Sequence, residues 1–529
     1  MVDQESSNGN GDGSSNGQDG AAPDSSIRQP LLPQNSLLSS SSNPSNIPPN
    51  WPDITLYKGA KLAPAAAAIA AGLALRYAVP VPEGLTDQAW SLLALFVTMV
   101  SGLVLAPLPT GAWAFLGATA GLLTHTLTFE QMFAAANNTV MWLVVVSFFL
   151  ARGFEKTGLG ERIANNLLTV CGSSSLQLAL GLAAAEVLIT PAMPSTTARA
   201  AGIFMPVIKS VSQAVGSMPG DESRKQLGAF LMQAQFQSSV HSSNFVMTAA
   251  AQNLLCLQMA ASVGVSLGDP FMTWLAGSSV PVLLGVVLTP CVLYWLWPPA
   301  ITSTPHAPAA AKARLQEMGP LSADEGVMIG AVTLAVGLWV FGGQLGVAPV
   351  TAAMCALGVL LASGVLSWQD CLQYTPAWDT LIWFTVLVSM AGGLQSLGVI
   401  DLFSGWAGGQ LSGLDLPWPA LFAGLHLLFF GMHYLFASQT AHVGALFAAF
   451  CSLMISAGVP PQLAAMSLAY NVNLFGSLTH YASGQAAVYF GAGYLKTEDV
   501  FLQGAACAVA NLLLWGSVGM LWWKVLGWY

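Results

Sequence analysis

Long apolar runs recur from about residue 62 to the end of the chain, and short polar interruptions separate them. Many runs approach the ~20 residues that a helix needs to cross a bilayer. The apolar positions do not alternate with polar ones, as they would in strands of a membrane barrel. The pattern therefore predicts an all-α polytopic membrane protein with spanning helices near 62–80, 88–106, 111–127, 138–152, 273–297, 326–345, 348–366, 380–400 and 501–526.

The composition agrees with this prediction. Of the 529 residues, 54% are hydrophobic and 7% are charged, whereas soluble domains carry roughly 25% charged residues. So few charges could not cover the surface of a soluble fold of this length, so we expect a lipid bilayer around the chain. The formal net charge of −9 argues against a nucleic-acid partner, which requires a basic surface.

Composition shifts divide the chain into four parts. Residues 1–55 are rich in Ser, Asn, Gly and Pro, which predicts a disordered tail. This tail has neither the apolar stretch of a secretory signal nor the basic, acid-poor composition of an organelle transit peptide. Residues 301–325 are Pro-rich and charged, and we interpret them as a linker between two transmembrane repeats at 56–300 and 326–529.

The two halves share short signatures in the same order, at offsets between 238 and 243 residues. An internal repeat with interrupted helices in corresponding positions is typical of secondary transporters, and the interruptions mark the substrate site. The matching signatures are "NTVMW" from Asn138 with "DTLIW" from Asp379, "STTAR" from Ser195 with "SQTAH" from Ser438, "QAQF" from Gln233 with "NVNL" from Asn471, and His241 with His480.

The first interruption contains Pro191 and Pro194, which disrupt a helix. Irregular backbone at membrane depth needs protein or water around it, so we expect a re-entrant helical hairpin here. A helix that resumes after the tip presents free N–H groups to an anion. Two such tips could hold the two carboxylates of one small molecule. The predicted tip residues are Ser195, Thr196 and Thr197 in the first half, and Ser438, Gln439 and Thr440 in the second.

Basic side chains follow both tips: Arg199 in the first half and His442 in the second. An ionisable residue inside the membrane is a functional-site hypothesis by default. A structural alternative remains open, in which Arg199 pairs with Glu186 across the hairpin. The second interruption of each half adds further lining candidates. These are Ser242, Ser243, Asn244, Thr479 and His480.

Longer motifs resemble a known family. "SFFLARGFEKTGLGERIA", "PAMPSTTARAAGIFMPVIKS", "AWDTLIWF" and "THYASGQAAVYFGAGY" are similar to the plant-type plastid dicarboxylate translocators of the divalent anion:sodium symporter family. The resemblance implies two inverted repeats, each with a re-entrant hairpin and a broken transmembrane helix, in a homodimer with elevator-type movement. It also implies exchange of C4/C5 dicarboxylates such as 2-oxoglutarate and malate across the plastid inner envelope.

The tips depart from the Ser-Asn-Thr motif of the family's sodium-coupled members, because Thr196 and Gln439 occupy the two Asn positions. Asn supplies a carbonyl oxygen that suits a hard cation, so its replacement argues against sodium coupling. Our hypothesis is that Arg199 and His442 offset the substrate charge in place of sodium.

Other functions stay open at this point. One is a sodium-coupled symporter of dicarboxylate, citrate or an inorganic oxyanion, and another is a channel. A membrane enzyme could use Glu186 and the histidine pair in acid–base roles, but no HExxH, GxSxG or paired-carboxylate motif supports it. No zinc-type ligand set is present, so we expect neither a metal nor a cofactor. The acidic tail leaves another organelle or a plasma membrane possible.

Overall fold

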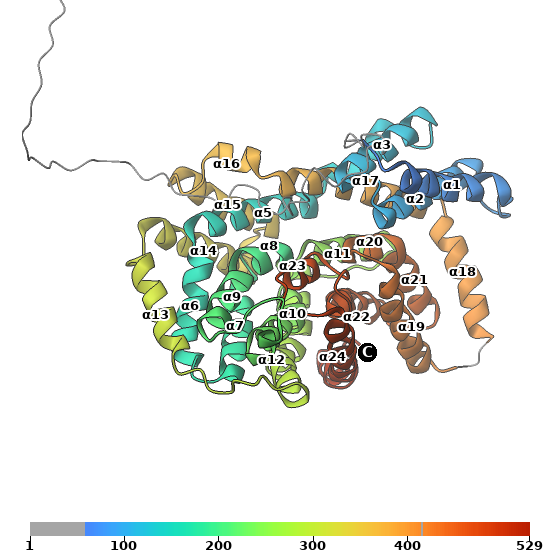
Figure 1. Cartoon of the computed structure of the whole chain (residues 1–529). Coiled ribbons are helices and arrows are strands. Elements are labelled where there is room, and N and C mark those ends of the chain that lie inside the picture. Colours follow the sequence, from blue (N-terminus) through green and yellow to red (C-terminus); the bar gives the residue numbers. More distant parts are fainter. Residues whose placement is uncertain (1–58, 414–415) are drawn as a thin grey trace, which may run out of the picture. The chain divides into compact units, whose positions relative to one another are not determined.

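The computed structural model describes residues 59–413 and 416–529, and every regular element in these two ranges is a helix (Figure 1). The predicted tail at 1–55 therefore lies outside the described residues. The prediction of an all-α fold is confirmed for the part of the chain that the structure describes.

The helices follow one another with short connections. The first group is α1 (Leu62–Ala78), α2 (Asp87–Leu105), α3 (Thr110–Leu123), α4 (Phe129–Met132), α5 (Thr139–Thr157) and α6 (Leu159–Cys171). The second is α7 (Ser175–Ile189), α8 (Thr196–Arg199), α9 (Met205–Ala214), α10 (Gly228–Phe245), α11 (Ala251–Ser262), α12 (Pro270–Leu296) and α13 (Ala307–Met318). The third is α14 (Ala323–Leu345), α15 (Pro349–Ala362), α16 (Trp368–Gln373), α17 (Thr375–Ser396), α18 (Val399–Ser412) and α19 (Trp418–Met432). The last is α20 (Gln439–His442), α21 (Ala448–Ser456), α22 (Pro461–Leu474), α23 (Gly484–Gly491), α24 (Thr497–Leu514) and α25 (Met520–Val525).

Seven helices or continuous helical runs in the described ranges are long and apolar enough to cross a membrane, which confirms a multi-pass membrane protein. They are Asp87–Leu105, Pro270–Leu296, Ala323–Gly342, Thr375–Ser396, Trp418–Leu435, Gln439–Ser456 and Thr497–Val525.

Short polar side chains begin many of these helices. The Thr86 hydroxyl accepts a hydrogen bond from the Ala89 N–H before α2, and Ser322 and Glu325 form a reciprocal capping box before α14. Such caps satisfy N–H groups that the first turn leaves without partners. The sequence thus sets where the helices start, while apolar surface sets where they pack.

In space, as distinct from their order along the chain, the helices pack in two groups. In the first, α17 packs against α2, α3 and α5, while α15 packs against α5 and α14. In the second, α10 packs against α7, α12 and α22, and α11 packs against α22 and α20. Figure 1 shows α2, α3, α5, α15 and α17 of the first group along the top, with α10, α12 and α22 of the second group below them. Contacts of α11 with α17 and α5 connect the two groups.

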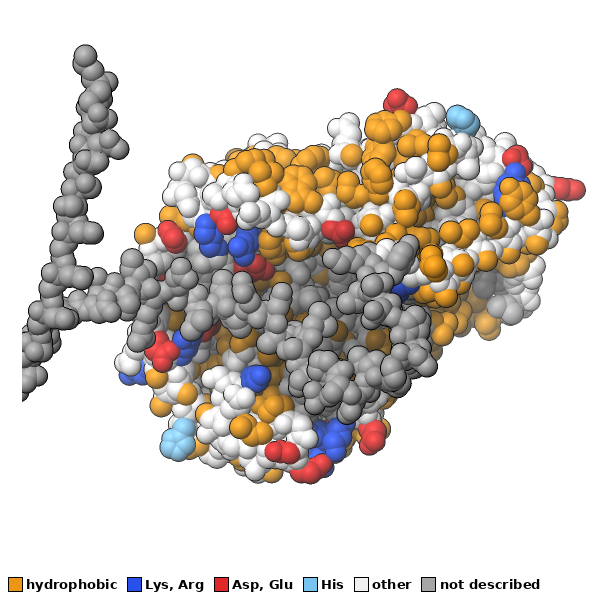
Figure 2. All heavy atoms as spheres, turned by 45° about the horizontal axis from the view of Figure 1, so that its top comes forward, with side chains coloured by type: hydrophobic (Ala, Val, Ile, Leu, Met, Phe, Trp, Pro, Cys, Tyr) orange, Lys and Arg blue, Asp and Glu red, His pale blue; other side chains and the backbone are white. Residues whose placement is uncertain are grey.

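Apolar side chains dominate much of the outer surface. In Figure 2 hydrophobic side chains cover most of the visible upper part, and charged side chains gather in small groups near the margins. Large exposed side chains on the spanning helices include Leu283 and Val287 on α12, Leu427 on α19 and Leu513 on α24. Lipid tails solvate such surface, which fits a membrane environment.

The segment between the two halves contains a folded helix. Helix α13 lies within the predicted linker at 301–325 and packs against α6. Arg314 on α13 forms ion pairs with Glu161 at 2.6 Å and Glu317 at 2.8 Å. These carboxylates raise the pKa of Arg314 further above its usual value, so the guanidinium stays charged.

We expect Asp370→Asn to lower the free energy of unfolding by at most about 1 kcal/mol at neutral pH. Lys156 lies 2.8 Å from the Asp370 carboxylate, and this ammonium, followed by the Ser367 N–H, holds the pKa of Asp370 well below its usual value. The stabilisation is therefore complete above the unfolded pKa of about 3.9 and is lost progressively as the pH falls from there through the lower pKa of the folded state. Thermal unfolding in detergent at pH 7 and pH 3 measures the difference. An equal gap between wild type and variant at both values would contradict the prediction.

Candidate substrate-binding site

Both predicted tips have the same local structure. Ser195 precedes α8 and its Oγ accepts from the Ala198 N–H at 3.2 Å; Ser438 precedes α20 and its Oγ accepts from the Ala441 N–H at 3.3 Å. Each short helix continues without a break through a π-helical turn into the next helix. These turns are η3 (Ala200–Phe204) and η7 (Val443–Phe447), again 243 residues apart.

The second interruption of the first half aligns with that of the second half at a different sequence offset from the one expected. Asn244 is the penultimate residue of α10 and Asn473 is the penultimate residue of α22. The expected match of His241 with His480 is wrong, because His241 lies inside α10 whereas His480 follows the 3-10 turn η8 (Phe475–Ser477). Helix ends, rather than a constant offset, define the correspondence, because α10 is four residues longer than α22.

A network of buried amides lies between the two halves. The Asn473 Nδ2 group donates to Asn244 Oδ1 at 2.7 Å and to Asn253 Oδ1 at 2.7 Å. The Gln252 Nε2 group donates to Asn473 Oδ1 at 2.9 Å, and Asn253 Nδ2 donates to the Ser243 carbonyl at 2.8 Å. All five residues are buried. Gln252, Asn253 and Asn473 were not predicted from the sequence.

Each tip contacts the other half of the chain at an equivalent place. The Thr196 hydroxyl donates to Gln485 Oε1 at 2.8 Å, and Gln485 is the second residue of α23. The Gln252 Nε2 group donates to Gln439 Oε1 at 3.3 Å, and Gln252 is the second residue of α11. Thus the tip of one half binds the second half-helix of the other. Gln485 was also missed, although its position after the Ser483 cap was a usable signal.

Arg199 is fully enclosed by protein groups. Its guanidinium donates to Glu186 Oε1 at 3.1 Å, to the Met193 carbonyl at 2.5 Å, to the Ala249 carbonyl at 2.7 Å and to Ser243 Oγ at 2.9 Å. The side chain has no exposed surface. The structure therefore contains the Glu186–Arg199 pair. The Arg199 bonds to the Ala249 carbonyl and to Ser243 fix the first tip to the second interruption.

His442 occupies the equivalent place in the second half. Its Nδ1 lies 3.2 Å from His433 Nδ1, while His433 Nε2 lies 2.8 Å from the Ala482 carbonyl. Because a carbonyl only accepts, His433 Nε2 carries the proton, its Nδ1 accepts, and His442 Nδ1 donates. Rings of Phe429, Phe436 and Phe475 surround His442. Burial among these rings disfavours a charged imidazole, so both histidines are neutral.

The remaining residues predicted from the sequence are not members of the amide network. Ser242 Oγ donates within its own helix to the Ser239 carbonyl, and Thr479 Oγ1 accepts from the Tyr481 N–H at 3.4 Å. His480 packs against the rings of Tyr481, Phe490 and Phe501, so it is not brought to the amide network. Thr197 is exposed and Thr440 is half-buried.

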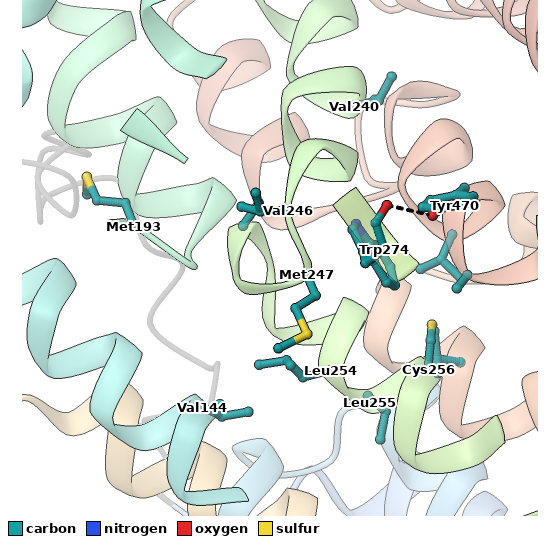
Figure 3. Close-up of a cluster of buried hydrophobic side chains, with 14 of the residues drawn as sticks. Val144, Met193, Val240, Val246, Met247, Leu254, Leu255, Cys256, Trp274 and Tyr470 are labelled. Carbon is teal, nitrogen blue, oxygen red and sulfur yellow. Dashed lines mark hydrogen bonds between the residues drawn. The ribbon is translucent and has the colours of Figure 1, made fainter. Parts of the chain in front are cut away.

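Buried aromatic and apolar side chains pack next to the asparagines of the amide network. The Trp274 indole donates to the Asn244 carbonyl at 2.8 Å, and the Tyr470 hydroxyl donates to the Trp274 carbonyl at 2.8 Å. Figure 3 shows the Trp274 and Tyr470 pair beside the buried apolar side chains of α10 and α11. These hydrogen bonds and packing contacts hold the amide groups in place, as a preorganised site requires.

We expect Gly476→Ala to reduce transport at least about tenfold. A Cβ at this position would lie 2.4 Å from Gln439 Nε2, so the Gln439 side chain would have to leave the Val472 carbonyl, to which it donates at 2.9 Å. The loss of such buried bonds costs about 1–3 kcal/mol. Gly491→Ala is the matched control, because a Cβ there meets no atom within 4 Å. Equal uptake by the two variants in proteoliposomes would contradict the prediction.

Comparison with known proteins identifies the family. Residues 60–529 match the model of the sodium:sulfate symporter transmembrane region. The chain is a member of this family. The match covers all described helices, and it confirms the resemblance seen in the sequence motifs.

Two relatives and one solved structure extend the comparison. The chain is 55% identical to Dicarboxylate transporter 2, chloroplastic, of Spinacia oleracea, over 89% of this chain and 84% of the relative. It is 32% identical to the Citrate/succinate antiporter of Escherichia coli (strain K12), over 86% of this chain and 96% of the relative. The crystal structure of the Alcanivorax borkumensis YdaH transporter aligns with a TM-score of 0.52 at 15% identity, over 77% and 89% of the two chains. That likeness concerns the fold alone.

Proposed function

We propose that this protein is a secondary transporter that exchanges C4/C5 dicarboxylates of the 2-oxoglutarate/malate type by alternating access. The observation that carries the proposal is the pair of matching tips, each capped by a serine. The second tip contacts the amide network through Gln439 and Gln252, and the helix that follows the first tip contacts it through Arg199 and Ser243. The names of the spinach and Escherichia coli relatives support the substrate class and the exchange mode.

The tips recognise the substrate with helix N-termini and hydroxyl groups. The N-terminus of a helix carries about half a positive charge and unpaired N–H donors. The Arg199 charge is already balanced by Glu186, and the His433–His442 pair is neutral. Arg199 therefore acts by positioning the first tip, and the two tips hold the carboxylates. Ser195, Thr197, Ser438 and Thr440 are the candidate contacts.

Contacts of the tip side chains favour exchange without sodium over the alternative of sodium-coupled symport. The Thr196 hydroxyl donates to Gln485 Oε1, and the Gln439 amide bonds Gln252 and the Val472 carbonyl. Both side chains that replace the family's tip asparagines are thus engaged with protein partners. A cation at Gln439 would have to share the amide oxygen with Gln252, and Thr196 offers a hydroxyl in place of an amide carbonyl oxygen.

Reconstitution into liposomes tests the function. We expect uptake of labelled malate to require internal 2-oxoglutarate, malate or succinate, and to be unchanged when choline replaces sodium outside. Uptake into empty liposomes driven by an inward sodium gradient would instead establish the symporter. Internal glutamate in a parallel sample decides whether amino-acid dicarboxylates are exchanged.

The membrane and the assembly are part of the same proposal. The name of the spinach relative supports a plastid membrane, and we propose the inner envelope. Inverted repeats, elevator movement and a homodimer follow from the family resemblance. Fractionation of plastid envelopes tests the location, and light scattering of the detergent-solubilised chain tests the dimer.

A further inference from the structure

A separate pocket lies between α19, α22 and the C-terminal helices α24 and α25. It encloses about 500 Å³ and is lined mainly by apolar and aromatic side chains, a volume in the range of small-molecule sites. Leu427 and Leu513 are more than half exposed at its rim. Because both belong to membrane-spanning helices, the pocket opens toward the lipid.

Polar groups in the pocket form a hydrogen-bonded chain with one defined direction. Ser467 Oγ donates to the Leu463 carbonyl at 2.5 Å, so it accepts from His426 Nε2, 2.9 Å away. His426 Nδ1 therefore has a lone pair, and Asn471 Nδ2 donates to it at 3.1 Å. No acidic side chain is present in the described lining of the pocket, so the imidazole is neutral, and its Nδ1 lone pair then fixes the orientation of the Asn471 amide.

The chain ends on an acceptor without a partner. Asn471 Oδ1 is buried and bonds no group in the described ranges, while the residue is 3% exposed. Trp515 lines the same pocket, is 4% exposed, and its indole N–H likewise has no acceptor among the described residues. The Tyr470 and Trp523 polar atoms are satisfied by the carbonyls of Trp274 and Gly277. Buried polar groups are normally hydrogen-bonded, so an unpaired acceptor and an unpaired donor on two residues that line one pocket point to a ligand.

We infer that this pocket binds an uncharged lipid that carries a free hydroxyl group, such as a diacylglycerol or a sterol. A hydroxyl both donates and accepts, so it can donate to Asn471 Oδ1 and accept from the Trp515 N–H. Apolar walls solvate the rest of the molecule. Asp, Glu, Lys and Arg are absent from the described lining, and an ionic headgroup or a dicarboxylate would be buried there without a counter-charge. The inference is independent of the proposed substrate.

Photolabelling of the full chain in phosphatidylcholine nanodiscs tests the inference. The probes are a diazirine-bearing diacylglycerol, its O-methyl ether and the corresponding phosphatidic acid; a diazirine sterol distinguishes the two lipid types. We expect the diacylglycerol or the sterol to label peptides of α19, α22 and α24. We expect about fivefold to tenfold less labelling by the ether, which cannot donate to Asn471, and less still by the charged lipid. Equal labelling by alcohol and ether would overturn the inference.

Two variants provide further checks. A Cβ at Gly516, which lines the pocket, meets no atom within 4 Å, so Gly516→Phe should fill the pocket and abolish labelling. Gly424→Phe on α19 is the matched control, because it also has open space but lies outside the lining. Asn471→Leu should retain labelling but lose the preference for alcohol over ether. Undiminished labelling of Gly516→Phe, or an unchanged preference in Asn471→Leu, would overturn the inference.

Discussion

Replacing Arg199 with methionine is expected to cost about 3–5 kcal/mol of stability and to remove most of the folded protein. The substitution leaves the Glu186 carboxylate buried with only the neutral side chains of Gln235 and Ser242 as polar contacts in the described ranges, and it removes the donors to two carbonyls. Removing one member of a buried ion pair has this cost, and it is a large share of a typical total stability. The monodisperse fraction on size exclusion and the melting temperature measure the effect.

Matched variants separate the structural role of Arg199 from a role in substrate binding. Arg152→Met removes an exposed pair at 3.5 Å and should leave stability nearly unchanged. Glu186→Gln combined with Arg199→Gln removes both charges, and we expect it to fold and to keep most of its exchange activity. A folded double variant with strongly raised KM for malate would show that the Arg199 charge contacts substrate. A stable Arg199→Met protein would contradict the structural role.

Replacing Asn473 with leucine is expected to reduce exchange about a hundredfold or more. The Asn473 amide joins Asn244, Asn253 and Gln252, so its loss leaves buried polar groups of the first half without these partners. Each unsatisfied group costs about 1–3 kcal/mol, and tenfold in rate corresponds to about 1.4 kcal/mol. Exchange per folded protein in proteoliposomes measures the effect.

Asn511→Leu is the matched control for this substitution. Asn511 is also a buried asparagine, but it accepts from His241 between α10 and α24 and has no bond to the amide network. We expect this variant to retain at least about ten times more exchange than Asn473→Leu. Equal losses in the two variants would mean that any buried asparagine matters, and would remove the special role of the network.

Local chemistry determined the parts of the site that the sequence could predict. Prolines, capping serines and the repeated "S-x-T-A-basic" pattern act within one turn of the chain, so they located both tips. The length of the apolar runs likewise located five of the seven membrane-spanning runs in the described ranges, because bilayer thickness sets the number of residues required. The predicted spans near 62–80, 111–127, 138–152 and 348–366 are not among the seven, and Trp418–Leu435 and Gln439–Ser456 were not predicted as spans.

The residues that contact each tip from the other half could not be predicted from such local patterns. Gln252 and Gln485 are single polar residues in apolar helices, and their roles depend on which tip lies opposite each. The choice between a bound substrate and Glu186 as the partner of Arg199 also depended on burial, which a linear pattern does not contain.

The sequence by itself determined the membrane environment, the helical class and the two tips, because apolar length, helix-breaking prolines and caps are local properties. Only the tertiary structure decided how the halves interlock and which amides meet. Hydrogen bonds between residues more than 180 positions apart form only when packing brings specific helix faces together, and sequence spacing carries no record of that geometry.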